Sequence, residues 1–385
     1  MNLRKLNLNT EGLNRKLKFI ESSQGPRITV GTKVLINFSS NDYLGLASDE
    51  RLKKAAKDSI EKEGVGSGAS RLICGGRDSH RKLESALADF KGTPQALVFN
   101  CGYMANVGII SALFDKGDII FSDKLNHASI LDGIILSRAE LRRYPHKDMG
   151  ALKRMLEGCS GYKRRCIITD SVFSMDGDIA PIDEIVCLAE KYDSIVMIDE
   201  AHAFGVFGKK GKGLAEHFGL EGKIEIQMGT LSKAAGATGG YVCSEESLIS
   251  YLVNKSRSFI YTTAMPPSIA ASACRAVEII QTEPGLREKL WENTKLAIKG
   301  IKEAGFNTLD SASQIMPIIV GDEEKAVKFS KMLIEEGIFV APIRHPSVPL
   351  RSSRLRVSIT AAHNKEDIEG LINSLKKIGR KLCLI

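Results

Sequence analysis

Short apolar segments that recur between about residues 95 and 245 are the feature that most limits how this 385-residue chain can fold. Each segment contains Ile, Val or Phe, and a stretch with helical character separates it from the next. The segments are 96–99, 119–121, 166–169, 195–198, 224–227 and 240–243. Strands that alternate with helices are typical of a mostly parallel sheet covered by helices on both faces. We therefore expect a large α/β domain whose ligands bind beyond the carboxyl ends of the strands.

The pattern changes in the last third of the chain. A long helical stretch follows Pro267 and reaches about residue 304. Three apolar stretches and two helices come after it: 315–320, a charged helix over 322–336, 338–343, 355–360, and a final helix from 365. We expect three parts in the whole chain, namely an N-terminal helix and arm (1–45), a large domain (46–290) and a smaller C-terminal α/β domain (291–385).

The composition is ordinary for a soluble globular protein. Hydrophobic residues make up 43% of the chain and charged residues 26%, which is ordinary for a globular protein. No apolar run approaches the roughly 18 residues that would span a bilayer. The leading segment alternates Leu with charge, so it lacks a signal peptide's continuous apolar core, and we expect it to be an amphipathic helix. We expect a cytoplasmic protein without a membrane partner.

Cysteine spacing and charge narrow the possible ligands. The eight cysteines are scattered and never form a CxxC pair, so we expect neither a metal site nor a disulfide framework. The formal net charge of +8 suits an anionic substrate such as a coenzyme A thioester. Nucleic acid is not an expected partner, because the basic residues are spread along the chain rather than clustered.

A carboxylate and a lysine indicate the chemistry. Asp199 closes the apolar segment 195–198 and His202 follows it, while Lys233 ends the polar turn Thr230-Leu231-Ser232-Lys233. An aldehyde cofactor needs an amine to bond to, and its pyridine ring needs a carboxylate to hold the ring nitrogen protonated. Asp199 could instead cap a helix and Lys233 could be a surface lysine. Together they predict pyridoxal phosphate (PLP).

Other candidates follow further strands. Gly102 and Tyr103 lie at a glycine turn into a helix, where backbone N–H groups favour a phosphate; such junctions are also common in any α/β fold. The Thr230 hydroxyl would add a phosphate contact. His127 could stack on the cofactor ring or satisfy local backbone groups, and Ser174 could line the site or be a turn hydroxyl.

Several motifs of the chain resemble those of a known family. Six motifs occur in the family's order: Asn41-Asp42-Tyr43-Leu44-Gly45-Leu46, Asn126-His127-Ala128-Ser129, Ser174-Met175-Asp176-Gly177, Asp199-Glu200-Ala201-His202, Thr230-Leu231-Ser232-Lys233 and Arg354-Leu355-Arg356. They are similar to those of the α-oxoamine synthases, which are aspartate-aminotransferase-like (fold type I) PLP enzymes. The resemblance covers nearly the whole chain and implies that fold, with a large domain around a mostly parallel sheet and a smaller C-terminal domain.

The resemblance also implies residue roles. Lys233 would bond to the cofactor aldehyde, Asp199 would pair with the pyridine nitrogen, His202 with the ring hydroxyl, and His127 would stack on the ring. The remaining cofactor contacts would come from Gly102, Tyr103, Ser174, Thr230 and Thr262. Thr262 would reach the site from the partner subunit, because sites in this family are built across a homodimer interface.

Substrate contacts are implied in the same way. Arg356 is similar to the arginine that binds the amino-acid carboxylate, a bidentate task suited to guanidinium. Asn41, His80 and Ser347 would also contact substrate. Arg15 corresponds more loosely to a substrate-contacting arginine, and it could equally be a solvated helix charge.

The implied activity is a decarboxylative condensation of an amino acid with an acyl thioester. Segments 261–267, 342–349 and 356–363 are most similar to family members that join L-alanine to a pimeloyl thioester, carried by coenzyme A or acyl carrier protein, in biotin synthesis. Segments 71–80 and 126–133 are similar instead to members that join glycine to acetyl-CoA. A third possibility is a catalytically silent regulatory subunit, which would be expected to lack Lys233 or Asp199.

Overall fold

The computed structural model of the chain describes residue 15 and residues 17–385. Most of the predicted N-terminal amphipathic helix therefore lies outside the described residues. None of the helices in the described part of the chain is both long and apolar enough to cross a membrane.

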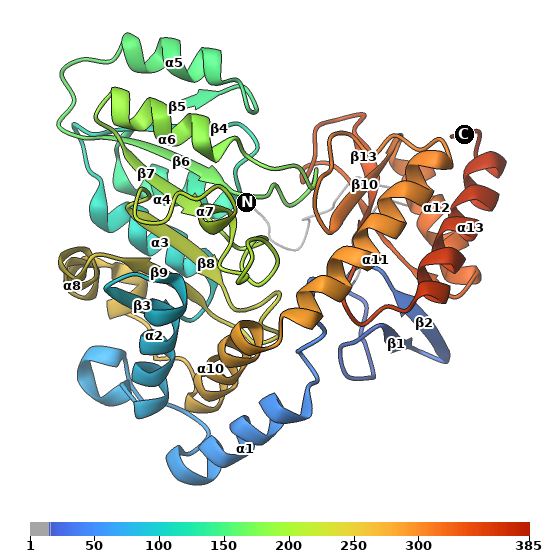
Figure 1. The fold of residues 1–385 in the computed structure, drawn as a ribbon, viewed down its shortest axis with the longest axis horizontal. Coiled ribbons are helices and arrows are strands. Elements are labelled where there is room, and N and C mark those ends of the chain that lie inside the picture. Colours follow the sequence, from blue (N-terminus) through green and yellow to red (C-terminus); the bar gives the residue numbers. More distant parts are fainter. Residues whose placement is uncertain (1–14, 16) are drawn as a thin grey trace, which may run out of the picture.

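A seven-stranded sheet forms the centre of the large part of the molecule (Figure 1). Its strands, in spatial order, are β3 (Gln95–Phe99), β9 (Gly240–Ser244), β8 (Ile226–Thr230), β7 (Ile195–Asp199), β6 (Arg165–Asp170), β4 (Ile119–Asp123) and β5 (Glu140–Tyr144). Strand β9 runs antiparallel to both of its neighbours, β3 and β8, whereas the other paired strands of the sheet are parallel. The predicted mostly parallel sheet is thus confirmed. The sequence did not predict β5, because this edge strand carries charged residues rather than an apolar run.

Helices cover both faces of the sheet. Alternate residues of β3 show this, since Leu97 and Phe99 pack in one apolar cluster, whereas Ala96 and Val98 pack in another. The first cluster includes α3 (Gly102–Leu113), α4 (Ala128–Ser137), α8 (Glu246–Lys255) and α9 (Arg257–Ile260). The second includes α1 (Glu50–Glu63), α2 (Asp78–Lys91), α5 (Met149–Glu157), α6 (Ile182–Lys191), α7 (Leu214–His217) and α10 (Pro267–Thr282).

The C-terminal part contains two small sheets. Antiparallel strands β10 (Ile315–Gly321), β13 (Ser353–Ser358) and β12 (Ala341–Ile343) form one, and β1 (Arg27–Val30), β2 (Lys33–Asn37) and β11 (Ile338–Phe339) form the other. Helix α12 (Glu323–Glu335) packs against both sheets, and α13 (Lys365–Lys381) packs against α12 and α11 (Pro284–Glu303). The apolar stretch predicted over 338–343 is divided between the two sheets at Val340. Because β2 pairs with β11, the N-terminal arm lies beside the C-terminal elements (Figure 1); the boundaries at 45 and 290 stay a prediction.

The helical stretch predicted to run to about residue 304 consists of two helices. Helix α10 ends at Thr282, and α11 (Pro284–Glu303) begins after one intervening residue, Glu283. Proline at the start of α11 explains the break, because its ring disfavours helical geometry in the residue before it, and Glu283 has an extended φ of −120°. The long helix α11 leads from the large part to the C-terminal part (Figure 1).

The carboxyl ends of the central parallel strands place polar residues side by side. Asp170 at the end of β6 pairs in register with Asp199 at the end of β7. Strand β8 runs parallel to β7 and ends at Thr230, shortly before Lys233. The sheet therefore brings these groups to one edge although they are far apart in sequence.

Candidate active site

Two adjoining cavities lie at this edge of the sheet. The inner cavity, of about 230 Å³, is lined by Cys101, Gly102, Tyr103, Asn106, His127, Ser129, Asp170, Ser174, Asp199, Ala201, His202, Met228, Thr230, Ser232 and Lys233. The outer cavity, of about 280 Å³, adds Ser39, Asn41, Met175, Ala341, Ile343 and Arg356. His127, Ser174, His202 and Lys233 line both, so the two spaces meet there. Eight of the predicted cofactor residues are thereby brought together, as well as Asn41 and Arg356.

Asp199 is held firmly at the inner cavity. It is buried, Oδ1 accepts a hydrogen bond from the N–H of Ala201 at 2.9 Å, and Oδ2 accepts one from Asn106 Nδ2 at 2.8 Å. Both carboxylate oxygens can accept a further bond, so the fixed carboxylate can pair with a cationic group in the cavity.

Asn106 is a site residue that the sequence prediction missed. Its Nδ2 donates both to Asp199 and to Ser129 Oγ, the latter at 2.9 Å. Ser129 Oγ in turn lies 2.7 Å from His127 Nδ1. This chain of contacts sets Asp199 and His127 relative to each other. Asn106 lies four residues after Gly102, hence on the same face of α3, and this spacing could have identified it.

His127 and His202 line the inner cavity and have defined polar neighbours. Burial lowers the pKa of His127. Its Nδ1 accepts the N–H of Ser129 at 3.3 Å, so a neutral ring carries its proton on Nε2. Burial, reinforced by Lys233 and Arg356, lowers the pKa of His202 well below its usual value. His202 Nδ1 is 2.6 Å from the hydroxyl of Tyr43, another residue not predicted to act at the site.

Asp170 is a second carboxyl group at the inner cavity. Its Oδ2 accepts the backbone N–H of His127 at 3.0 Å, and its own N–H donates to Asn126 Oδ1 at 2.9 Å. Burial raises the pKa of Asp170 well above its usual value, and the nearby charge of Asp199 acts in the same direction. The raised pKa favours the protonated, neutral form of the Asp170 carboxyl group.

The Lys233 amine lies between the two cavities. It has no hydrogen-bond partner within the described part of the chain, so it is available to bond to a ligand. Burial lowers the pKa of Lys233, although the charges of Asp199 and Asp170 partly oppose this. A lowered pKa increases the fraction of the neutral amine, which is the form that attacks a carbonyl and accepts a proton.

The other end of the inner cavity is suited to an anion. Helix α3 begins at Gly102 without a side-chain cap, and the N–H groups of Gly102 and Tyr103 have no partner among the residues described. Such groups, with the helix dipole, favour a phosphate. A Cβ added to Gly102 would lie only 3.4 Å from Thr230 Oγ1, so this helix end closely approaches β8. The Thr230 and Ser232 hydroxyls are 2.8 Å apart beside it.

These residues fit pyridoxal phosphate. The uncapped N-terminus of α3, with Thr230 and Ser232, would hold the phosphate, and Asp199 would hold the ring nitrogen. Lys233 lies within the same cavity for the aldehyde. Ser232 was not predicted to contact the cofactor, and its place beside Thr230 adds a hydroxyl at the phosphate end.

The outer cavity contains a fixed guanidinium. Arg356 is buried, its Nε donates to the carbonyl oxygen of Ser174 at 2.6 Å, and its Nη1 donates to Asn41 Oδ1 at 3.1 Å and to Ser358 Oγ at 2.8 Å. A guanidinium held in this way can bind a carboxylate without first losing side-chain freedom.

Four predicted residues lie outside both cavities. His80 is buried, with one ring nitrogen bound to the carbonyl of Met265 and the other to the N–H of Arg77. Thr262 Oγ1 accepts a hydrogen bond from Asn100 Nδ2 at 3.3 Å. Thr262 and His80 both line a separate small cavity. Ser347 is exposed in a turn, and Arg15 donates to the carbonyl of His345 in that same turn. Their roles stay predictions.

Comparison with known proteins agrees with this geometry. The family model for aminotransferase class I and II matches residues 33–375. The 8-amino-7-oxononanoate synthase of Thermoanaerobacter pseudethanolicus is 48% identical over 379 residues, which cover 98% of this chain and 96% of that one.

Two solved structures are similar as well. Serine palmitoyltransferase from S. paucimobilis, with PLP and myriocin bound, has a TM-score of 0.93 at 34% identity and covers 96% of this chain and 94% of its own. The 8-amino-7-oxononanoate synthase from Francisella tularensis has a TM-score of 0.79 at 32% identity, and the match covers 90% of this chain and 98% of that one. The fold predicted from the α-oxoamine synthase resemblance is confirmed, and the chain belongs to the aminotransferase class I and II family.

Proposed function

We propose that this protein is a PLP-dependent α-oxoamine synthase that joins L-alanine to a pimeloyl thioester, yielding 8-amino-7-oxononanoate, carbon dioxide and free thiol for biotin synthesis. The observation that carries this proposal is the inner cavity, where Asp199, Lys233 and the uncapped N-terminus of α3 meet. The adjoining outer cavity with Arg356 has the group needed to bind an amino acid beside the cofactor.

The residues have separable tasks. PLP, when bound, supplies an aldehyde that bonds to amines and a cationic ring that accepts electrons from the substrate α-carbon. Lys233 has a lowered pKa, so its neutral amine can remove the α-proton as a general base. Arg356 binds the amino-acid carboxylate and orients the α-carbon. His127 carries its proton on Nε2 and can donate a hydrogen bond to the acyl carbonyl oxygen as negative charge develops there.

The substrate pair rests on sequence likeness. Relatives at 45–48% identity over 97–98% of the chain carry the name 8-amino-7-oxononanoate synthase. Glycine with acetyl-CoA is the alternative substrate pair.

A thiol-release assay tests the substrate pair. With purified holoenzyme, kcat/KM for L-alanine plus pimeloyl-CoA should exceed that for glycine plus acetyl-CoA by at least about tenfold, since each added methylene contributes binding energy. Crossed pairs, alanine with acetyl-CoA and glycine with pimeloyl-CoA, separate the amino-acid preference from the acyl preference. A higher value for glycine plus acetyl-CoA would refute the assignment.

An exposed apolar patch supports a homodimer. It consists of Val65, Leu72, Ile73, Tyr103 and Tyr261, of which Ile73 is 80% and Tyr261 73% exposed. These residues lie on connected elements, because Arg71 stacks over the Phe259 ring and Ser258 donates to the carbonyl of Met104. Tyr103 also lines the inner cavity. A second copy covering this patch would lie beside the phosphate end of the site, consistent with Thr262 acting across the interface.

Mixed dimers test whether Thr262 acts across the interface. Thr262→Ala should weaken PLP binding by about tenfold, because a hydrogen bond to the phosphate is lost. When this variant is co-expressed with Lys233→Ala under separate tags, the mixed dimer should contain one intact site and recover activity at limiting PLP. If Thr262 acts within its own chain, the mixed dimer has no intact site and stays impaired.

A further inference from the structure

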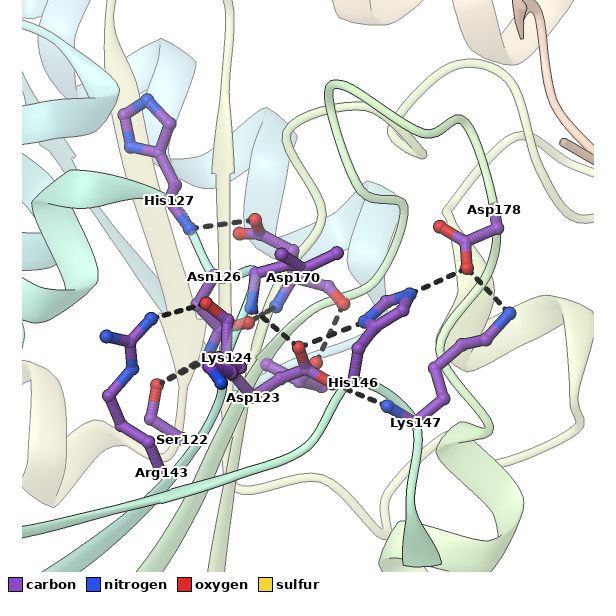
Figure 2. A network of polar contacts seen from close by, with 12 residues as sticks. Ser122, Asp123, Lys124, Asn126, His127, Arg143, His146, Lys147, Asp170 and Asp178 are labelled. Carbon is purple, nitrogen blue, oxygen red and sulfur yellow. Dashed lines mark hydrogen bonds and ion pairs between the residues drawn. The ribbon is translucent and has the colours of Figure 1, made fainter. Parts of the chain in front are cut away.

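A group of six charged residues lies outside both cavities and has no assigned task. These residues, called here the ionic clamp, are Asp123, His146, Lys147, Asp176, Asp178 and Arg354. None of them lines the inner or the outer cavity. Figure 2 shows Asp123, His146, Lys147 and Asp178, with His127 and Asp170 nearby in the same network.

His146 is the centre of the clamp. Its Nδ1 lies 3.0 Å from Asp123 Oδ1, and its Nε2 lies 2.8 Å from Asp178 Oδ2 (Figure 2). A neutral imidazole would turn a lone pair toward one of these carboxylates, so both nitrogens must donate and the ring must be cationic. Burial lowers the pKa of His146, but the hydrogen bonds and charges of the two carboxylates outweigh it and raise the pKa to about 9.

The other members balance the charge. Lys147 Nζ lies 2.6 Å from Asp178 Oδ2, and Arg354 pairs with Asp176. Three cations thus face three carboxylates. His146, Asp176 and Asp178 offer ligand atoms within 4.8 Å of one another, and Asp178 Oδ1 is buried without a hydrogen-bond partner among the described residues. A metal ion would nevertheless have to displace the second proton of His146 and the Lys147 ammonium, so the balanced charges favour a purely ionic network.

The clamp joins two loops that carry residues of both cavities. Asp123 Oδ1 accepts the N–H of Leu125 at 2.8 Å, and the Asp123 carbonyl accepts the N–H of Asn126 at 3.2 Å, so Asp123 shapes the turn that leads to His127. The carbonyl of Asp178 accepts the N–H of Phe173 at 3.0 Å and closes the loop that contains Ser174.

The clamp also reaches the C-terminal sheet. Arg354 lies two residues before Arg356 on β13, and both arginines hold the loop after β6. Arg354 pairs with Asp176, whereas Arg356 Nε donates to the carbonyl of Ser174. The amino-acid-binding guanidinium is therefore set against the same loop that His146 ties to Asp123.

We propose that the ionic clamp is a positioning device, with His146 at its centre, that holds His127, Ser174 and Arg356 in the relative arrangement needed to bind and orient the amino-acid substrate. The inference rests on the proposed function for its kinetic consequence. Its structural consequence, the ordering of segments 123–127 and 172–178, does not depend on which substrates the enzyme uses.

The variant His146→Gln tests this proposal, because glutamine cannot donate to both carboxylates in the same way or carry charge. In the holoenzyme, the KM for the amino acid should rise about tenfold from loss of charge-assisted bonds. Affinity of the apoenzyme for PLP should change less than the KM does, because Asp199, Thr230 and the N-terminus of α3, which the clamp does not contact, are unchanged in this variant. Backbone hydrogen exchange should increase in segments 123–127 and 172–178 and stay unchanged in 195–202. The matched control is His217→Gln, at an exposed histidine on α7.

The pH dependence separates positioning from a general loss of stability. The ratio of the variant's KM to the wild-type KM should be largest below pH 9 and fall toward one as His146 of the wild-type enzyme loses its second proton. Ionisation of the substrate affects both KM values equally at a given pH, so its effect cancels in the ratio. If His146→Gln is insoluble, Asp123→Asn, which removes one charge from the same contact, should give the same pattern with a smaller change in KM.

Three outcomes would overturn the inference. One is unchanged hydrogen exchange in both segments of His146→Gln, matching the His217→Gln control. Another is a KM ratio that does not vary with pH. A third is loss of exchange protection in the wild-type enzyme when EDTA is added, which would show that a bound cation holds the cluster. If no tested amino acid is a substrate but the exchange pattern is as expected, the proposed function fails while the clamp stands.

Discussion

Replacing Lys233 by alanine should reduce turnover by about 10⁴-fold, because one change removes both the amine that bonds to the cofactor and the general base. Wild-type holoenzyme should be yellow and should acquire a covalent cofactor on Lys233 after borohydride reduction. The variant should show no such bond by mass spectrometry of its peptides. Non-covalent PLP should still bind, since the α3 N-terminus, Thr230 and Asp199 are unchanged.

The matched control for this experiment is Lys210→Ala. Lys210 is exposed and lines neither cavity, so this variant should keep wild-type turnover and the reducible bond. If borohydride reduction of Lys233→Ala attaches the cofactor to another lysine, that lysine is the cofactor-binding residue and the assignment of Lys233 is refuted.

Replacing Asp199 by asparagine should reduce turnover by about 10³-fold while the protein stays folded, because the ring nitrogen would lose the carboxylate that keeps it protonated. The substitution of asparagine for aspartate is nearly isosteric. Asn106 can reverse its amide to face the new side chain, because its Oδ1 is buried without a partner among the described residues. The cofactor absorbance should shift and turnover should fall, whereas the thermal unfolding temperature should change little.

Asp193→Asn is the control for Asp199→Asn. Asp193 is exposed just before the opposite end of strand β7, so the same chemical change there should alter neither absorbance nor turnover. Turnover within about tenfold of wild type in Asp199→Asn would show that another group keeps the ring nitrogen protonated.

Local patterns were enough to predict the elements that carry the cofactor residues. The strand ending at Asp199 and the turn containing Lys233 each consist of neighbouring residues whose side-chain types indicate their conformation. Helix breaks and edge strands were harder to predict, as β5 shows. Its charged residues are tolerated because the strand has a neighbour on one side only, and the sequence pattern does not show which strand lies at an edge.

The residues that hold the site residues in place could not be predicted from the sequence, because their contacts join distant parts of the chain. Asn106 meets Asp199 across 93 positions, and Arg356 meets the Ser174 carbonyl across 182. No sequence pattern indicates His146, because its charge and position depend on two carboxylates, Asp123 and Asp178, that lie on separate segments of the chain. Periodicity and motif spacing report on neighbours in the chain, whereas these pairs exist only after the sheet has brought the loops together.

The sequence by itself determined the α/β architecture, the cofactor class and the principal pair Asp199 and Lys233, because alternating apolar segments must be buried in a sheet and the chemistry requires an amine and a carboxylate. Only the tertiary structure decided how those groups are held. It joined the inner and outer cavities, set Arg356 against the Ser174 loop, and brought His146 between Asp123 and Asp178 in the ionic clamp. The physical reason is that positions and charge states of buried polar groups depend on their partners in space, and the order of residues along the chain does not specify those partners.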